Sequence, residues 1–454
     1  MQEYLIQLSG YFITLFILLY TLLSFWAFVF KQEDNYKAIF IFQDLLMFAA
    51  LLFCFMDISL VSRQKQYVIF YLFVQGFLII GLLLVRILYK NANKLLLNNM
   101  FMLLGIGLFM ISRLSHAKAR KQFIIIVIAF ALSLIIPYLI SKINGLQKMT
   151  WLYATIGITM LVVVLVLGEF TRGSKLSFTL GGISFQPSEF VKILFLFLLA
   201  GCLWENTSLK RICVTSLLGG IHVILLVIST DLGSALIFFV SFVFVVLIAS
   251  NNYLYLLAGV AGGAAAAFVA YQLFDHVRIR VLAWQDPWSY IDNQGYQITQ
   301  SLFAIGSGSW FGMGILKGNP KSIPFVEADF IFSSICEELG VIVGICIILI
   351  CISSFLMMIQ IAIKTRDRFF QIIVYGIGIM YIFQIFLTIG GGVKFIPLTG
   401  VTLPFISYGG SSVMVSILMF FIVQGIYIRI QKEGVKKVVP EAKTDDGSET
   451  QAIQ

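Results

Sequence analysis

Residues 325–358 read FVEADFIFSSICEELGVIVGICIILICISSFLMM, and this stretch decides the fold class. Four acidic residues stand in its first part, whereas no charged residue follows Glu338. The charge-free remainder has about 20 residues, the length of helix that crosses a hydrocarbon core of roughly 30 Å. We therefore predict a membrane-spanning helix over residues 330–358, with acidic residues at its beginning.

Similar apolar runs recur along almost the whole chain. The 454 residues are 60% hydrophobic and 12% charged, and the mean hydropathy is +0.98. A soluble globule has too little interior to bury so much apolar surface. The short alternating segments of a membrane barrel are missing, so helices must satisfy the backbone in lipid. The sequence predicts an all-α polytopic membrane protein with thirteen spans, near residues 8–30, 38–61, 67–88, 96–113, 122–141, 151–168, 187–204, 212–229, 231–249, 254–274, 330–358, 369–392 and 406–429.

The charged residues and cysteines exclude several other classes of protein. The net charge is +9, but the 31 Lys and Arg residues stand in short loops and in the tail. This placement is typical of the positive-inside rule and argues against nucleic acid as a partner. The six cysteines all fall in apolar runs without metal-ligand spacing, so we predict neither a disulfide framework nor a zinc site.

The tail and the loops predict an orientation. Residues 432–454 are polar and carry lysines beside the last span, so we expect a disordered cytoplasmic tail. Counting back through thirteen spans places the amino terminus and the long loop 275–328 outside. The basic segment 113–122 then also falls outside. Either an early span is miscounted, or this segment has a reason to be positive there, such as an anionic lipid head group.

Polar residues gather at the helix ends that this orientation places outside. They occur in FQPSEFVK (185–192), TDLGSA (230–235), ADFIF (328–332) and VKFIPLTGVTLPFISYGGSS (393–412). The clustering predicts a water-accessible cavity that opens to the outside and is lined by acids and a few cations. Asp231 and Asp329 each precede an apolar run, so both are also candidates for N-cap residues.

Glu337 and Glu338 follow Asp329 by eight and nine residues. On one continuous helix they would lie about 12 to 13 Å deeper, near the middle of the bilayer. Charges at that depth usually face the protein interior and have partners. Lys192 and either Arg278 or Arg280 are the candidate partners.

Such a cavity suits chemistry on a lipid-linked sugar. A carboxylate can act as a general base on a hydroxyl, while Arg, Lys or a divalent cation can stabilise a phosphate leaving group. The glycine-rich run 306–314 lacks the GK[ST] ending of a phosphate loop, so we expect a flexible interfacial loop there.

Several segments, in order along the chain, resemble the SEDS family (shape, elongation, division and sporulation), the group that contains RodA, FtsW and SpoVE. They are FQPSEFVKI, TDLGSAL, GYQITQSLFAIGSG, ADFIFSSICEELG and PLTGVTLPFISYGGSS. The resemblance implies a ten-helix core over residues 95–431, preceded by about three additional helices in residues 1–94. It also implies that the protein polymerises lipid II into glycan strands on the outer face of the bacterial cell membrane. A class B penicillin-binding protein would be the partner.

The resemblance assigns roles to individual residues. Asp329 matches the essential aspartate of the family and would be the general base. Asp231 would support substrate or cation binding, and Lys192 and Glu189 would shape the cavity. Further candidates for substrate binding are Arg278, Arg280, Glu327, Lys394 and Ser407. The resemblance does not require a cofactor. The candidate is a divalent cation, Mg²⁺ or Mn²⁺.

Two alternatives use the same features. A lipid II flippase would need the cavity and the deep acids but no base at the outer mouth. A scaffold would only recruit the penicillin-binding protein. The sequence departs from the family pattern beside Asp329, with Ala328 in place of threonine and Phe325 in place of glutamate. These departures keep the scaffold function as an alternative.

Overall fold

The protein is a bundle of long helices with one small sheet. The computed structural model describes residues 2–29, 33–143, 145–171, 174–180 and 183–438. The N-terminal helices are α1 (Gln2–Trp26), α2 (Glu33–Ser62), α3 (Lys65–Leu88) and α4 (Lys94–Leu114). The middle of the chain forms α5 (His116–Ser133), α6 (Ile136–Lys142), the 3-10 turn η1 (Leu146–Lys148), α7 (Thr150–Leu167), β1 (Glu169–Thr171), β2 (Ser174–Leu180), β3 (Ile183–Phe185), α8 (Pro187–Leu203), α9 (Leu209–Ile228), α10 (Leu232–Ser250) and α11 (Tyr253–Leu273). The C-terminal part forms α12 (Asp275–Gln285), α13 (Tyr296–Gly308), η2 (Pro320–Ser322), α14 (Ile331–Leu339), α15 (Val341–Lys364), α16 (Arg368–Gly392) and α17 (Gly410–Val438).

The prediction of an all-α polytopic membrane protein is confirmed. Twelve helices in the described part of the chain are long and apolar enough to cross a membrane. The span predicted at 187–204 corresponds to α8, which has 17 residues and begins at Pro187, a residue suited to the first helical turn.

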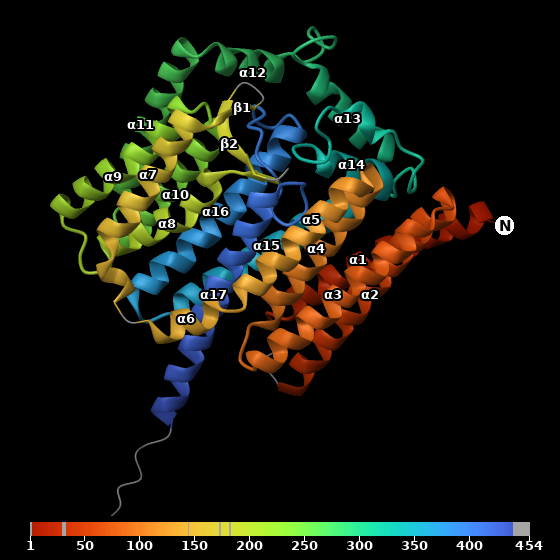
Figure 1. Cartoon of the computed structure of the whole chain (residues 1–454), viewed down its shortest axis with the longest axis horizontal. Helices are drawn as coiled ribbons and strands as arrows, with labels where there is room; N and C mark the ends of the chain where they lie inside the picture. The colour runs from red at the N-terminus through yellow and green to blue at the C-terminus, as the bar shows by residue number, and fades with distance from the viewer. Residues whose placement is uncertain (1, 30–32, 144, 172–173, 181–182, 439–454) are drawn as a thin grey trace, which may run out of the picture.

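Helix α4 forms the centre of one half of the bundle. All its residues from Leu95 to Leu114 are buried, as expected for a helix that is apolar on every side. Helices α2, α3, α5 and α15 pack against it. Figure 1 shows α1–α3 along one side of the molecule, where they extend the bundle instead of forming a separate body.

Buried hydrogen bonds fasten α1 and α2 to the rest of the bundle. Asn99 of α4 accepts from the Tyr20 hydroxyl at 3.1 Å and donates to the Ser354 hydroxyl at 3.1 Å. Gln43 of α2 donates to the Ser24 hydroxyl of α1 at 3.0 Å. Interhelical polar contacts of this kind hold helices together in lipid, where apolar burial provides little driving force.

The two ends of the bundle differ. Figure 1 shows α12 and the sheet at one end and the last turns of α17 at the other. We call the first the loop end and the second the tail end. Helix α1 begins at the loop end, where it faces loop residues 311–317, so the amino terminus and the long loop share one end as the count of spans predicts.

A three-stranded antiparallel sheet connects α7 to α8 at the loop end. Its strand order is β1-β2-β3, and Phe178 of β2 lies opposite Phe185 of β3. The sequence analysis did not foresee these strands, because they are short and lie between two long apolar runs.

The span predicted over residues 330–358 is wrong at its start. The segment forms two helices, α14 and α15, separated at Gly340, which has a φ of 93°. Few side chains tolerate that backbone angle, so glycine ends α14. Glu337 and Glu338 therefore lie on the short helix α14, which precedes the candidate span Val341–Lys364, and not inside one continuous spanning helix.

The glycine-rich run 306–314 is not a loose loop, contrary to expectation. Its backbone runs along the break between α14 and α15: Met313 N–H donates to the Glu337 carbonyl at 2.8 Å, and Val341 N–H donates to the Ser309 carbonyl at 3.0 Å. Added Cβ atoms at Gly308 and Gly312 would lie 2.0 Å and 2.3 Å from backbone oxygens of α14. The glycines permit this close backbone approach. The long loop 275–328 also contains α12, α13 and η2.

The first residues of the predicted disordered tail are helical. Helix α17 continues through residues 432–438. The rest of the predicted tail, 439–454, lies outside the described residues.

Candidate active site

A cavity of about 480 Å³ opens at the loop end. Its lining residues come from β2 and β3, from the beginnings of α5, α8, α10 and α17, from α12, and from the segments 327–329 and 399–402. The four polar segments singled out in the sequence therefore meet in one place.

Asp329 lines this cavity from the turn that precedes α14. Its N–H donates to the Phe325 carbonyl at 3.2 Å. The N-cap residue of α14 is Phe330, so the capping interpretation is wrong for Asp329. The half-buried Asp329 side chain is instead part of the cavity wall.

Asp231 caps α10, as one interpretation predicts. Its Oδ1 accepts from Ser234 N–H at 3.2 Å, and its Oδ2 accepts from the Ser188 hydroxyl at 3.0 Å and from Gln186 Nε2 at 3.3 Å. Asp231 also lines the cavity. The carboxylate thus joins the beginnings of α10 and α8 at the cavity wall.

Arg280 brings a positive charge to the two aspartates. It projects from α12, lines the cavity, and donates to the Leu398 and Thr399 carbonyls at 3.3 Å and 3.2 Å. Burial lowers the pKa of Arg280, whereas the nearby charges of Asp329 and Asp231 raise it. A guanidinium stays protonated under such conditions, so Arg280 is a permanent cation beside both carboxylates.

Glu189 and Lys192 form a buried pair under the cavity. Lys192 Nζ lies 2.9 Å from both carboxylate oxygens of Glu189 and 2.9 Å from Gln384 Oε1. Glu189 lines the cavity, whereas Lys192 does not. Lys192 therefore acts on the site by holding Glu189.

Glu327 faces the cavity beside a lysine that the sequence analysis did not select. It forms an ion pair with Lys118, which also lies 5.7 Å from the centre of the Tyr408 ring. Lys118 and Lys121 both line the cavity. The basic segment 113–122 thus lies at the loop end, as the count of spans predicts. Its unexpected positive charge on that side was the sequence feature that could have identified Lys118 and Lys121 as cavity residues.

Ser407, Lys394 and Arg278 do not line the cavity. Ser407 donates to the Ala328 carbonyl, so it supports the residue next to Asp329. Lys394 lies near Asp286, and Arg278 pairs with Asp275 at 3.5 Å. These positions give Arg278 and Lys394 no direct contact with a ligand in this cavity.

Glu337 and Glu338 are buried, as predicted, but their expected partners are wrong. Arg113 Nη2 contacts Glu338 Oε1 at 2.6 Å, and Arg113 Nε contacts it at 2.8 Å. Leu316 N–H donates to the same carboxylate at 3.2 Å, and Asn319 N–H donates to Glu337 Oε1 at 2.8 Å. The two acids therefore fasten the long loop to α14 and α4.

The carboxylates of the cavity are mostly held by other side chains. No group of three or more His, Cys, Asp or Glu in the described part of the chain is arranged to hold a metal ion. Glu189 and Glu327 are each paired with a lysine, and Asp231 with hydroxyl and amide donors. A divalent cation at this cavity therefore stays a prediction, and no chemical step is derived through it.

A family model described as cell cycle protein, covering FtsW, RodA and SpoVE, matches residues 93–433. The chain belongs to this SEDS family. Helices α1–α3 precede the matched region of the SEDS fold, whereas all the cavity residues lie within it.

Named relatives and solved structures agree with this assignment. The peptidoglycan glycosyltransferase RodA of Mycobacterium bovis is 32% identical over 364 residues, which cover 74% of this chain and 78% of the relative. The probable peptidoglycan glycosyltransferase FtsW of Pseudoalteromonas translucida is 30% identical and covers 78% of this chain and 92% of its own.

The fold is similar to two solved structures. A chain from a peptidoglycan synthase complex that coordinates polymerization and crosslinking matches with a TM-score of 0.62 and 24% identity, over 74% of this chain and 97% of that chain. The rod shape determining protein RodA of Thermus thermophilus matches with a TM-score of 0.57 and 21% identity, over 74% of this chain and 96% of that chain.

Proposed function

We propose that this SEDS protein is a peptidoglycan glycosyltransferase that polymerises lipid II into glycan strands, with Asp329 as the general base. One observation carries the proposal: Asp329 shares a cavity with Asp231 and the cations Arg280, Lys118 and Lys121. A general base must lie within hydrogen-bond reach of the attacking hydroxyl, and a diphosphate leaving group needs positive charge. This cavity offers both.

The reaction then proceeds by one displacement. The sugar 4-hydroxyl of one lipid II attacks the anomeric carbon of a second, and the hydroxyl proton passes to Asp329. A glycosidic C–O bond forms as the bond from the anomeric carbon to the diphosphate breaks. The electron pair leaves with undecaprenyl diphosphate, whose charge Arg280 and the lysines stabilise.

Asp231, Lys192 and Ser407 hold other parts of the cavity in position. Asp231 ties α8 to α10, and Lys192 holds Glu189 at the cavity floor. Ser407 supports the backbone beside Asp329. We infer that they position the reacting groups and that their loss reduces activity without removing the base.

The proposed site lies on the outer face of the bacterial cell membrane. Support comes from the tail end, where Lys432 lies in the last turn of the last span, Gly410–Glu433, because basic residues at the ends of spans favour the cytoplasm. A class B penicillin-binding protein is the proposed partner, in keeping with the fold shared with a chain of a peptidoglycan synthase complex.

The test is polymer formation from purified lipid II, with and without the co-purified penicillin-binding protein. Loss of a general base typically costs about 10² to 10⁴ in rate, so Asp329→Asn should make at least about 100-fold less polymer than wild type. Asp292→Asn is the matched control, because Asp292 is exposed in the same loop and does not line the cavity.

The alternatives give different results. Undiminished polymer from Asp329→Asn would exclude the base. If no protein polymerises even with the partner while lipid II still binds, the polymerase is rejected in favour of a flippase or a scaffold.

A further inference from the structure

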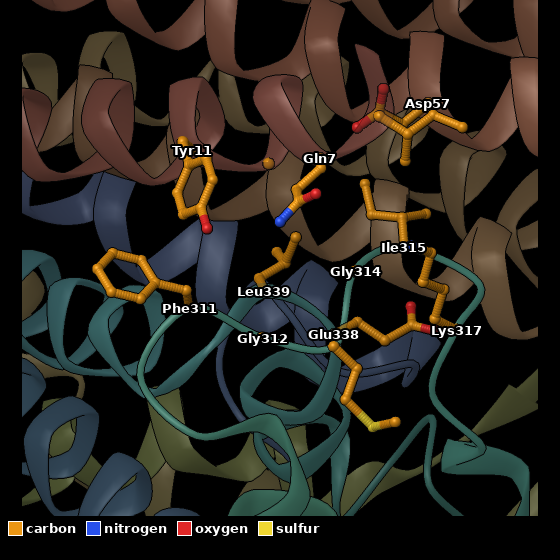
Figure 2. Close-up of a pocket in the computed structure, with 13 residues that line it drawn as sticks. Gln7, Tyr11, Asp57, Phe311, Gly312, Gly314, Ile315, Lys317, Glu338 and Leu339 are labelled. Atoms are coloured by element: carbon orange, nitrogen blue, oxygen red, sulfur yellow. The ribbon is translucent and has the colours of Figure 1, made fainter. Parts of the chain in front are cut away.

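A second cavity, of about 210 Å³, lies between the additional N-terminal helices and the SEDS core. One wall comes from Ile6–Tyr11 of α1 and from Asp57 of α2, and the other from loop residues 311–317 and the end of α14. Figure 2 shows the side chains of Gln7 and Tyr11 reaching from α1 toward that loop and α14. This cavity is separate from the active site, because the two cavities have no lining residue in common.

Asp57 is the distinctive residue of this cavity. Asp57 is 0% exposed and lies in the last turns of the membrane-spanning helix α2. In the described part of the chain, no cation forms a salt bridge with it, and its hydrogen-bond donor is the Ser9 hydroxyl at 2.6 to 2.7 Å. An ionisable side chain in a membrane segment usually has a partner and a function.

Ser9 cannot satisfy this carboxylate. A hydroxyl has one hydrogen, and the Ser9 hydroxyl also lies 2.8 Å from the Ile6 carbonyl. A carboxylate has two oxygens with about four acceptor positions. Most of the acceptor capacity of Asp57 therefore stays available to a donor in the cavity.

The rest of the cavity suits a lipid head group. Lys317 supplies a positive charge on the loop side. Tyr11 and Phe311, 48% and 54% exposed, contact each other edge to face with ring centres 5.5 Å apart at the cavity. Amphipathic aromatic rings at the ends of spans are typical of the level of the lipid head groups.

We propose that this cavity binds the head group of an aminophospholipid. The ammonium donates hydrogen bonds to Asp57, the phosphate faces Lys317, and the acyl chains pass the Tyr11–Phe311 pair into the bilayer. The primary ammonium supplies both the missing counter-ion and the missing donors. A zwitterionic head group also matches the arrangement of Asp57 and Lys317, because Glu338, the other carboxylate at the cavity, already forms an ion pair with Arg113.

Glu338 gives the cavity a connection to the active site. It lines the cavity at the end of α14, the helix that begins two residues after Asp329. Arg113, its partner, lies at the end of α4, just before the segment that carries Lys118. If the proposed function holds, lipid bound here stabilises the segment that positions the general base.

The test is native mass spectrometry of the full-length protein with phosphatidylethanolamine or phosphatidylcholine added at equal concentration. Both head groups are zwitterionic, but the quaternary ammonium of phosphatidylcholine has no N–H to donate. Since a hydrogen bond to a charged group is worth roughly a factor of ten, wild type should bind phosphatidylethanolamine about tenfold more tightly. Asp57→Asn should remove this preference.

A second variant tests the cavity without changing Asp57. An added Cβ at Gly10 meets no atom within 4 Å, so Gly10→Leu should extend into the cavity and reduce binding. Gly76→Leu is the matched control, because Gly76 of α3 has equally open surroundings and does not line this cavity. It should bind lipid as wild type does.

Three results would overturn the proposal: equal binding of the two lipids by wild type, an unchanged preference in Asp57→Asn, or unchanged binding in Gly10→Leu. The measurement needs no enzyme activity. A failure of the glycosyltransferase assay would therefore leave the lipid result intact, and the reverse also holds.

Discussion

At the scale of the residue, the ion pair between Arg113 and Glu338 shows what burial does to a charge. The two side chains are 7% and 0% exposed. Burial raises the pKa of Glu338, while the hydrogen bonds and the charge of Arg113 lower it. Arg113→Met removes the positive charge and the hydrogen bonds that stabilise the buried Glu338 carboxylate. We therefore expect the free energy of unfolding to fall by about 3 to 5 kcal/mol.

This loss should depend on pH. Without Arg113 the pKa of Glu338 rises further above its usual value of 4.5. A group with a raised pKa in the folded state stabilises the protein less as pH increases through that range. Thermal unfolding in detergent should therefore show a larger effect of Arg113→Met at pH 8 than at pH 5.

The exposed pair of Arg211 and Glu205 supplies the control. These side chains are 37% and 45% exposed. Arg211→Met should change stability by less than about 1 kcal/mol, because water already solvates the charges. Equal losses in the two variants, or a loss in Arg113→Met that does not change with pH, would contradict this account of Glu338.

At the scale of the element, Gly340 determines where the membrane helix begins. It has a φ of 93°, and an added Cβ would lie 2.3 Å from the Trp310 carbonyl oxygen. Gly340→Ala should cost about 1 to 3 kcal/mol, because the backbone is strained and the packed loop must move. Gly262→Ala in α11, where a Cβ meets no atom within 4 Å, should be neutral or slightly stabilising.

Unfolding midpoints of both glycine variants test this interpretation. If Gly340→Ala is as stable as Gly262→Ala, the close approach of the loop to α14 is not needed for the fold. The same variant should also reduce polymer formation, because the proposed base lies in the turn directly before α14.

The elements also show how far the sequence could be interpreted. Run length predicted nearly every span, because apolar length is what lipid selects. Run length missed the break at Gly340, because the sequence is apolar on both sides of this residue. The break arises from the packing of the loop backbone against the end of α14. The clustering of polar residues at helix ends predicted the cavity. Lys118 was missed, because it pairs with Glu327, which lies about two hundred positions away in the sequence.

At the scale of the whole molecule, the decisive property is which end faces the outside. The proposed function requires the loop end to be outside and the tail end in the cytoplasm. Of the six cysteines, Cys213 alone is exposed, so Cys213→Ser gives a background with buried thiols only. Single cysteines at exposed positions on opposite ends then report the orientation.

Asn293→Cys lies in the long loop at the loop end, and Asn206→Cys lies between α8 and α9 at the tail end. In intact cells, a membrane-impermeant maleimide should label Asn293→Cys. It should label Asn206→Cys only after the membrane is permeabilised. The reverse pattern would place the cavity of Asp329 in the cytoplasm. That result would rule out strand synthesis on the outer face, even if the purified protein polymerised lipid II. The labelling therefore tests the location of the reaction, and the Asp329→Asn assay tests its chemistry.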